Sequence, residues 1–433
     1  MSNKIDTANS LIEYINNSPT AFHAVKTAKE ELKDNGFIEL NLSEEWKLEI
    51  GKKYFTTRND SSLFAFITGT GDIASEGFRI IASHSDSPTF KIKPNPEIIK
   101  ENHFITLNTE VYGGPILMTW LDRPLSIAGR VSLDSNNPLK PNNLLIDFKR
   151  PVAIIPNLAI HLNRSVNEGV ELNRQIDMLP LVGEIKPGTS ATDFFKSAIS
   201  AELKTSPDKV LDYDLTVYDT TLGTLMGFEN EFISSSRIDN LAMVHSSLLA
   251  IYNAKPQPFT QMVAIFDNEE VGSLTKQGAD SPLFKHIFER IVNNLGNSKE
   301  AFYRSVHNSF LISADMAHSV HPNKPEKHDP TSRPLLNKGP VIKIHANQKY
   351  TSDGDSTAVF ESLCKKAEVP YQKFVNRSDA VGGSTLGNLS TGQLEIRSVD
   401  VGNPMLAMHS VRELSGTSDH YYMTKVFKAF FEE

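Results

Sequence analysis

Cysteine is nearly absent from this chain of 433 residues, which contains only Cys364. A single thiol cannot form an intrachain disulfide, and it excludes every zinc site that needs two or more thiolates from one chain. A metal site in this protein would therefore have to use histidine and carboxylate ligands. Cys364 itself lies in a predicted helix, residues 356–367, where we expect a small, packed side chain.

Long hydrophobic runs and an excess of positive charge are missing as well. No stretch approaches the roughly 18 consecutive apolar residues of a membrane span, and residues 1–19 lack the apolar centre of a secretory signal. We therefore expect a cytoplasmic protein without a membrane span. Lysine and arginine number 44 against 52 aspartate and glutamate residues, for a net charge of −8. This balance argues against a general nucleic-acid binder, which needs a basic face.

The composition is that of an ordinary globular protein, with 39% hydrophobic and 22% charged residues. From about residue 231 onward, apolar strands alternate with helices, and the last strand is predicted at residues 393–399. This alternation indicates an α/β domain with a central, largely parallel sheet flanked by helices. Residues 91–230 instead show short alternating segments separated by Pro, Asn and Gly. We expect an inserted β-rich domain there, interrupting an α/β domain formed by residues 1–90 and 231–433.

Acidic and imidazole side chains follow three of the predicted buried strands. His84 and Asp86 follow strand 78–83, Glu269 and Glu270 follow strand 261–267, and Asp315 and His318 follow strand 309–313. In open α/β sheets the ligand crevice lies at the carboxyl ends of the strands. Because burying so many acids together requires a compensating cation, the three clusters predict one metal site.

Asp239 and His409 could complete such a site, but each has a simpler explanation. Asp239 lies where a helix is expected to begin, so it could be an N-cap or first-turn carboxylate. His409 lies in an apolar run and could be a core histidine with a satisfied ring. Their residue types alone leave these alternatives open.

The chemistry that these groups support is metal-assisted hydrolysis. Two divalent ions share a bridging carboxylate, lower the pKa of a water and polarise a carbonyl. Of the adjacent pair, Glu270 can bind a metal while Glu269 takes the proton from the water. In the His-x-Asp pattern, Asp86 can hold the second ring nitrogen of His84. The sequence therefore predicts a hydrolase.

Seven motifs in order along nearly the whole chain resemble the metallo-aminopeptidase family that includes aspartyl aminopeptidase. The motifs are residues 82–88, 158–164, 236–240, 266–273, 313–318, 339–343 and 406–413. The chain departs from the pattern at Asn157, Gly382 and Asn388, where family members often have histidine, cysteine and proline.

The resemblance implies a set of roles for individual residues. Two zinc ions would be bound by His84, Asp239, Glu270, Asp315 and His409, with Asp239 bridging them. Glu269 would be the general base and Asp86 the partner of His84, while His318, Lys343 and Tyr350 would line the substrate pocket. The inserted domain would mediate assembly into a homododecamer, in which His161 reaches the site of a neighbouring subunit. The substrates would be short peptides with a free N-terminus, with a preference for Asp or Glu at that end.

Several alternatives remain at this stage. His161 could be a structural residue or an extra metal ligand, Lys343 an ordinary strand lysine, and Tyr350 a half-buried tyrosine. The enzyme could prefer neutral N-terminal residues, and Mn²⁺ or Co²⁺ could replace Zn²⁺. The loop around Ser384 lacks the Gly-x-Ser-x-Gly pattern, which argues against a serine hydrolase using Ser384. A non-catalytic metal-binding protein would have no use for the free base Glu269.

Overall fold

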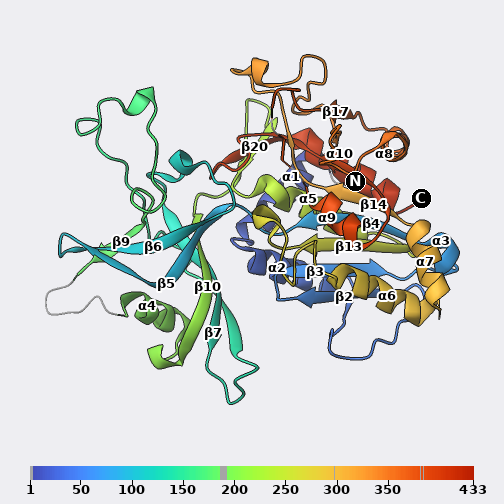
Figure 1. Ribbon diagram of the computed structural model, residues 1–433, viewed down its shortest axis with the longest axis horizontal. Helices are drawn as coiled ribbons and strands as arrows, with labels where there is room; N and C mark the ends of the chain where they lie inside the picture. Colours follow the sequence, from blue (N-terminus) through green and yellow to red (C-terminus); the bar gives the residue numbers. More distant parts are fainter. Residues whose placement is uncertain (1–2, 186–192, 297, 381, 384) are drawn as a thin grey trace. The chain divides into compact units, whose positions relative to one another are not determined.

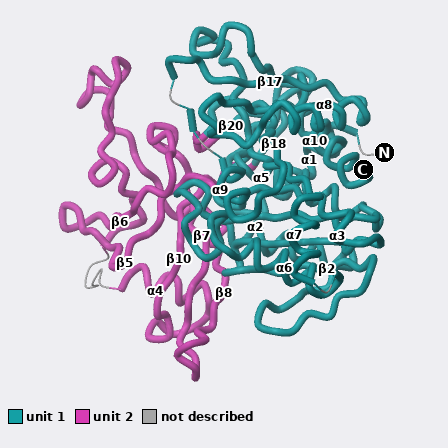
Figure 2. Tube along the Cα trace, turned by 45° about the vertical axis from the view of Figure 1, so that its right-hand side comes forward, with its two compact units in different colours: residues 1–86, 223–408, 413–433 teal, residues 87–222, 409–412 magenta. Residues whose placement is uncertain are grey.

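The computed structural model describes residues 3–185, 193–296, 298–380, 382–383 and 385–433. The chain forms two compact units (Figure 2). Unit 1 consists of Met1–Asp86, Gly223–Met408 and Glu413–Glu433, and unit 2 consists of Ser87–Leu222 and His409–Arg412. Within the described residues, no helix has both the length and the apolar character needed to cross a membrane.

Unit 1 is built on a nine-stranded sheet whose centre is parallel (Figure 1). In sheet order the strands are β1 (Ile38–Glu39), β2 (Lys53–Arg58), β3 (Ser62–Ile67), β13 (Thr260–Phe266), β4 (Phe78–His84), β14 (Phe310–Ala314), β18 (Arg397–Gly402), β16 (Val341–Lys343) and β17 (Gln372–Phe374). Strands β13, β4, β14 and β18 run parallel to one another. The predicted α/β class is therefore confirmed, although the parallel part is flanked by antiparallel pairs.

The antiparallel pairing of β2 with β3 is explained by the turn that joins the two strands. Asn59, Asp60 and Ser61 connect β2 to β3, and the first two have positive φ angles, 60° and 54°. Two consecutive left-handed residues form the tight hairpin turn that matches the twist of antiparallel strands, and Asn and Asp tolerate this conformation. The alternation of strands and helices along the sequence does not predict such a hairpin.

Helices cover both faces of the nine-stranded sheet. One face packs against α1 (Lys4–Asn16), α2 (Ala21–Asp34), α5 (Ile238–Tyr252), α8 (Gly354–Lys366) and α10 (Thr417–Phe430). The other face packs against α3 (Ile73–Glu76), α6 (Leu283–Leu295), α7 (Lys299–His307) and α9 (Leu386–Gln393). Strand β4 shows the principle, because Ile81 joins the first core while Ile80 and Ala82 join the second. The predicted strand 393–399 is wrong in its first residues, since α9 ends at Gln393 and β18 begins at Arg397.

A second, five-stranded sheet also belongs to unit 1. Its order is β11 (Thr224–Met226), β12 (Phe232–Ser235), β20 (Glu413–Gly416), β19 (Pro404–Leu406) and β15 (Ala317–His318). Because β11 pairs with β12, and β12 with β20, residues 223–230 lie in unit 1, whereas the sequence placed them in the inserted domain.

Unit 2 is an antiparallel sheet with its own core. The strand order is β8 (Asn142–Asp147), β7 (Leu125–Leu133), β10 (Val210–Asp219), β5 (Thr89–Lys100), β6 (Phe104–Tyr112) and β9 (Leu181–Glu184). Helix α4 (Phe194–Leu203) and the sheet share a hydrophobic core that includes Phe90, Trp120, Phe195 and Val217. The β-rich character expected of this part of the chain follows from the alternating segments. Its function as an oligomerisation domain stays a prediction.

Candidate metal centre

Three parallel strands of unit 1 bring the predicted site residues to one edge of the sheet. In β13 and β4, Phe266 pairs with His84, and in β14 and β4, Ser313 pairs with Ala82. The chain leaves β13 for the short helix η4 (Glu269–Val271) and leaves β14 for Asp315. The carboxyl ends of three neighbouring strands therefore lie side by side, which is where an open α/β sheet holds its ligand.

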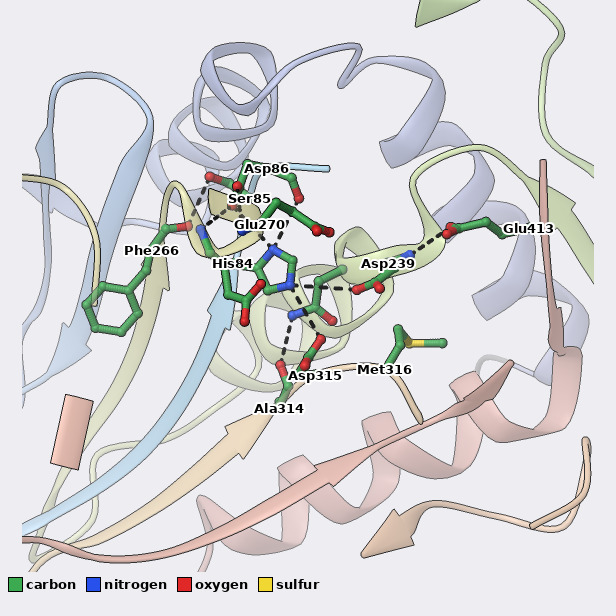
Figure 3. A network of polar contacts seen from close by, with 12 residues as sticks. His84, Ser85, Asp86, Asp239, Phe266, Glu270, Ala314, Asp315, Met316 and Glu413 are labelled. Carbon is green, nitrogen blue, oxygen red and sulfur yellow. Dashed lines mark hydrogen bonds and ion pairs between the residues drawn. The ribbon is translucent and has the colours of Figure 1, made fainter. Parts of the chain in front are cut away.

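His84 is the centre of the cluster, with carboxylates on both sides of its ring (Figure 3). Its Nδ1 lies 3.1 Å from the backbone oxygen and 3.3 Å from Oδ1 of Asp86. Its Nε2 lies 3.4 Å from Oδ1 of Asp315 and 3.6 Å from Oδ1 of Asp239. Burial by itself lowers the pKa of an imidazole, but hydrogen bonds to Asp315 and Asp86 hold the pKa of His84 well above its usual value.

Asp239 reaches the cluster because the first residues of α5 are not helical. Its φ and ψ are −78° and 109°, and its backbone N–H donates to Oε2 of Glu413 at 3.0 Å. The side-chain amide of Asn240 donates to the backbone oxygen of Ala314 at 2.9 Å. The start of α5 is thus held to β20 on one side and to the end of β14 on the other. The residue that precedes the helix as its cap is Arg237, so Asp239 is not the N-cap, whereas its position does match the other simple explanation, a carboxylate in the first turn.

Asp86 organises the turn that carries the glutamate pair. Its Oδ1 accepts the backbone N–H of Glu269 at 3.1 Å, and its Oδ2 accepts that of Glu270 at 3.2 Å. The same carboxylate lies beside Nδ1 of His84. One buried side chain at the end of β4 therefore orients both the imidazole and the backbone from which the two glutamates project.

The cluster contains several buried carboxyl groups, and burial disfavours their ionised forms. Burial, followed by the charge of Asp315, raises the pKa of Asp239 well above its usual value. Burial and the charge of Asp239 do the same to Glu270. Burial raises the pKa of Glu269 to about 7. Carboxyl groups whose ionised forms are disfavoured in this way would be stabilised by a cation placed among them.

Two sets of side chains in unit 1 have the geometry of cation ligands. Each set offers ligand atoms within 4.8 Å of one another: His84 with Glu269 and Glu270, and His84 with Asp239 and Asp315. Imidazole nitrogen and carboxylate oxygen are the donors that zinc, manganese and cobalt accept in proteins. The residues present therefore fit divalent metal ions.

Lys343 lies beside this cluster with its ammonium group buried. Its Nζ is 3.2 Å from Oδ2 of Asp315 and 3.1 Å from the backbone oxygen of Met316, and the residue is 3% exposed. Burial disfavours the charged form, but Asp315 raises the pKa of Lys343 above its usual value. In turn, although burial opposes it, Lys343 holds the pKa of Asp315 below its usual range. Lys343 is thus not a strand lysine that extends into water.

Of the two other predicted substrate residues, Tyr350 lies beside Lys343 and His318 lies near Phe374. The ring of Tyr350 lies 5.5 Å from its Nζ, and Tyr350 is 6% exposed. His318, exposed on β15, lies 6.0 Å from the ring of Phe374, and Phe374 packs with Tyr350, Val341 and Ala317 in a small apolar cluster.

His409 and His161 belong to unit 2. His409 follows Met408 directly, has a φ of 66°, and its Nδ1 lies 3.1 Å from the backbone oxygen of Gly114. His161 is exposed, as are Ile160 and Leu162 beside it, which are 53% and 74% exposed. The roles of both histidines therefore stay predictions. Ser384 lies outside the described residues.

The sequence did not predict several residues that support the cluster through hydrogen bonds or packing. Glu413 ends one of the seven motifs, but nothing in its residue type indicated that it would accept the N–H of Asp239. Asn240 directly follows Asp239 within another motif, and its bond to Ala314 joins residues 74 apart in the chain. No sequence pattern around Phe374 predicted that it would lie near the site.

The chain is similar to known proteins along nearly its whole length. Residues 14–431 match the model of a family described as aminopeptidase I zinc metalloprotease (M18). The chain is 54% identical to a probable M18 family aminopeptidase 2 of Clostridium novyi, with all of both chains covered. It is similar to Ape4 in its complex with Nbr1, with a TM-score of 0.95, 35% identity, and 99% of this chain and 86% of that chain covered. It is also similar to the S. cerevisiae mApe1 dodecamer, with a TM-score of 0.86, 26% identity, and 99% and 97% covered.

Proposed function

Because the chain belongs to the M18 family of aminopeptidases, we propose that it removes the N-terminal residue from short peptides by metal-assisted hydrolysis at the ends of β4, β13 and β14. The observation that carries this proposal is the imidazole of His84, whose Nε2 faces two buried carboxylates. A binding protein would need those ligands, but only an enzyme has a use for Glu269 beside them.

The proposed metal ligands are those that the family resemblance named. His84, Asp239, Glu270, Asp315 and His409 would hold two ions, with Asp239 shared between them. When bound, such ions would lower the pKa of a water and polarise the scissile carbonyl. Zinc is the proposed metal, in line with the family's description, and the same donors also accept manganese or cobalt.

Glu269 is the proposed general base. In the metal-free protein burial raises the pKa of Glu269 to about 7. Bound cations would lower this pKa, so the side chain would be ionised and able to accept a proton from the water. Asp86 holds the backbone N–H of Glu269 and so orients the side chain toward the reacting water. On release of the new N-terminus, the proton held by Glu269 would pass to the leaving amine.

Lys343, Tyr350 and His318 form the proposed pocket for the N-terminal side chain. An ammonium group has three donors, and Asp315 and Met316 accept two of those of Lys343. The third donor could bind the side-chain carboxylate of an N-terminal Asp or Glu, as the acidic preference requires. A preference for neutral residues is the second candidate, because Asp315 already offsets the charge of Lys343.

His161 is proposed to act in the site of a neighbouring copy. It is exposed in a segment with apolar neighbours, and such side chains are commonly covered by a partner. The similarity to a dodecameric protein supports a homo-oligomer, and we propose a dodecamer.

The test of the proposed function is activity on a panel of aminoacyl substrates before and after metal removal. Prolonged chelation should abolish hydrolysis, and Zn²⁺, Mn²⁺ or Co²⁺ should restore it. Substrates with a blocked N-terminus are the control, because an aminopeptidase should not cleave them. Full activity in protein shown by elemental analysis to contain no metal would refute the proposal.

A further inference from the structure

We propose that Asp400 is a positioning residue that holds the Tyr350 segment and the glycine-rich segment in place beside the metal centre. The Tyr350 segment is residues 348–352, and the described part of the glycine-rich segment is residues 382–383 and 385–388. This inference rests on the proposed function, because it assigns Asp400 to the substrate side of the same site.

Asp400 is a fully buried carboxylate that accepts hydrogen bonds from both segments. It lies in β18 and is 0% exposed. Its Oδ2 accepts the backbone N–H of Thr351 at 2.6 Å and the hydroxyl of the same residue at 2.9 Å. Its Oδ1 accepts the hydroxyl of Thr385 at 2.7 Å. Thr351 follows Tyr350 directly, so the carboxylate fixes the backbone from which that ring projects.

The backbone of Asp400 strengthens the first of these links. Its N–H donates to the hydroxyl oxygen of Ser352 at 2.9 Å. Main chain and side chain of one residue thus hold two consecutive residues of the Tyr350 segment against β18. Hydrogen bonds to a charged acceptor are about twice as strong as neutral ones, which suits a residue that must hold a segment without a helix or strand.

Gly387 shows how closely the glycine-rich segment approaches this carboxylate. A Cβ atom at this position would lie 2.9 Å from Oδ2 and 3.0 Å from Oδ1 of Asp400, and 2.8 Å from Oγ of Ser313. The absence of a side chain at Gly387 therefore allows α9 to begin directly above the carboxylate.

Two further hydrogen bonds join the same two segments. Nζ of Lys349 donates to the backbone oxygen of Gly382 at 2.6 Å, and the amide of Asn388 donates to the backbone oxygen of Gln348 at 2.8 Å. The segments are therefore hydrogen-bonded to each other, and both are also hydrogen-bonded to the buried carboxylate of Asp400 in β18.

Different strands at this edge of the sheet therefore have different roles. The metal ligands leave β4, β13 and β14, whereas Asp400 in β18 acts through Tyr350 and the glycine-rich segment. Loss of its charge should therefore weaken substrate binding and leave the metal ions in place. A purely structural residue would instead change stability without changing KM.

The test compares Asp400→Asn with wild type for KM, kcat, metal stoichiometry and melting temperature. We expect KM to rise about tenfold or more, since Asn loses the charge and one of the two acceptor atoms, with kcat changed less and metal content unchanged. Asp355→Asn is the matched control, because Asp355 is an exposed carboxylate paired with Arg397 on the protein surface. Its KM should stay within about twofold of wild type.

A second pair of variants covers the case in which Asp400→Asn does not fold. Thr351→Val removes one hydroxyl donor at nearly constant volume, and Thr351→Ser keeps it. We expect KM to rise severalfold in the Val variant and to return to within about twofold of wild type in the Ser variant. Unchanged KM in both Asp400→Asn and Thr351→Val, or loss of metal in Asp400→Asn, would overturn the inference. Failure of the proposed function would appear separately, as wild-type protein without metal-dependent hydrolysis.

Discussion

Two of the regions in which unit 1 buries histidine side chains shift the pKa of the imidazole in opposite directions. At the metal centre, carboxylates outweigh the effect of burial and hold the pKa of His84 well above its usual value. Between helices α5 and α10, burial acts without a carboxylate partner, and it lowers the pKa of His245 to about 3. Burial alone therefore does not decide the charge of a histidine, because its partners do.

The second region is a chain of hydrogen bonds between neutral groups. Nε2 of His245 lies 2.9 Å from the hydroxyl of Ser10, and its Nδ1 lies 2.9 Å from Nε2 of His420. Nδ1 of His420 lies 3.2 Å from the hydroxyl of Ser246, and the two rings stack 5.1 Å apart. Burial, and then the neighbouring His245, lower the pKa of His420. We infer that this region is structural, while the metal centre is where charge is used.

The largest expected effect separates the two adjacent glutamates of the metal centre. Glu269→Gln keeps the size of the side chain but cannot take a proton, so kcat should fall by about 10²- to 10⁴-fold with metal content near normal. Glu270→Gln should lose metal as well as activity. Elemental analysis beside kinetics distinguishes these outcomes, and the reverse pattern would exchange the two assignments.

The next effect concerns the buried cation of the metal centre. For Lys343→Met we expect kcat/KM for Asp substrates to fall by about 10- to 150-fold, as loss of a charge-assisted hydrogen bond predicts. Leu substrates should lose much less. Because Lys343 also contacts Asp315, metal content must be measured in the same preparation. Equal losses for both substrates would favour the neutral preference.

The contributions of the two histidine regions to stability should change with pH in opposite directions. The pKa of His245 is lower in the folded than in the unfolded protein, so the unfolded state binds more protons between about pH 3 and 6.5. Its contribution to stability is present above about pH 6.5 and is lost as the pH falls. His84 in metal-free protein works in the other direction, since its raised pKa contributes stability at low pH that is lost as the pH rises through the folded-state pKa.

His245→Gln removes the titratable imidazole of His245 and leaves that of His84 in place. Between pH 7 and pH 5 the wild type should lose about 2 kcal/mol more unfolding free energy than the variant, at about 1.36 kcal/mol per pKa unit. Urea unfolding at three pH values measures the difference. Parallel pH profiles for the two proteins would show that His245 is not held neutral.

The smallest effect tests the end of the hydrogen-bonded chain. Ser10→Ala removes the hydroxyl beside Nε2 of His245 and should lower the unfolding free energy by about 1 kcal/mol. Asn9→Ala, an exposed change on the same helix, is the control and should have almost no effect. Equal results for the two variants would remove Ser10 from the network.

Much of the candidate metal centre, as a cluster of side chains, could be predicted because its signals are local. Each of β4, β13 and β14 is an apolar run that ends next to acidic or imidazole residues, and a parallel sheet brings those ends together. The supporting contacts could not be predicted, because they join distant parts of the chain. Glu413 accepts the N–H of Asp239 across 174 residues, and Asp400 accepts that of Thr351 across 49. Nothing in the pattern around a lone buried acid indicates which donors the fold will bring to it.

The bonds from Asp86 to the backbone of Glu269 and Glu270 make this turn suitable for redesign. Because the carboxylate holds main-chain N–H groups, it supports the turn whichever side chains project from it. The side chain at position 270 could therefore be exchanged to change metal selectivity while the proposed base Glu269 is kept. Asp86 would have to stay untouched in such an engineering programme.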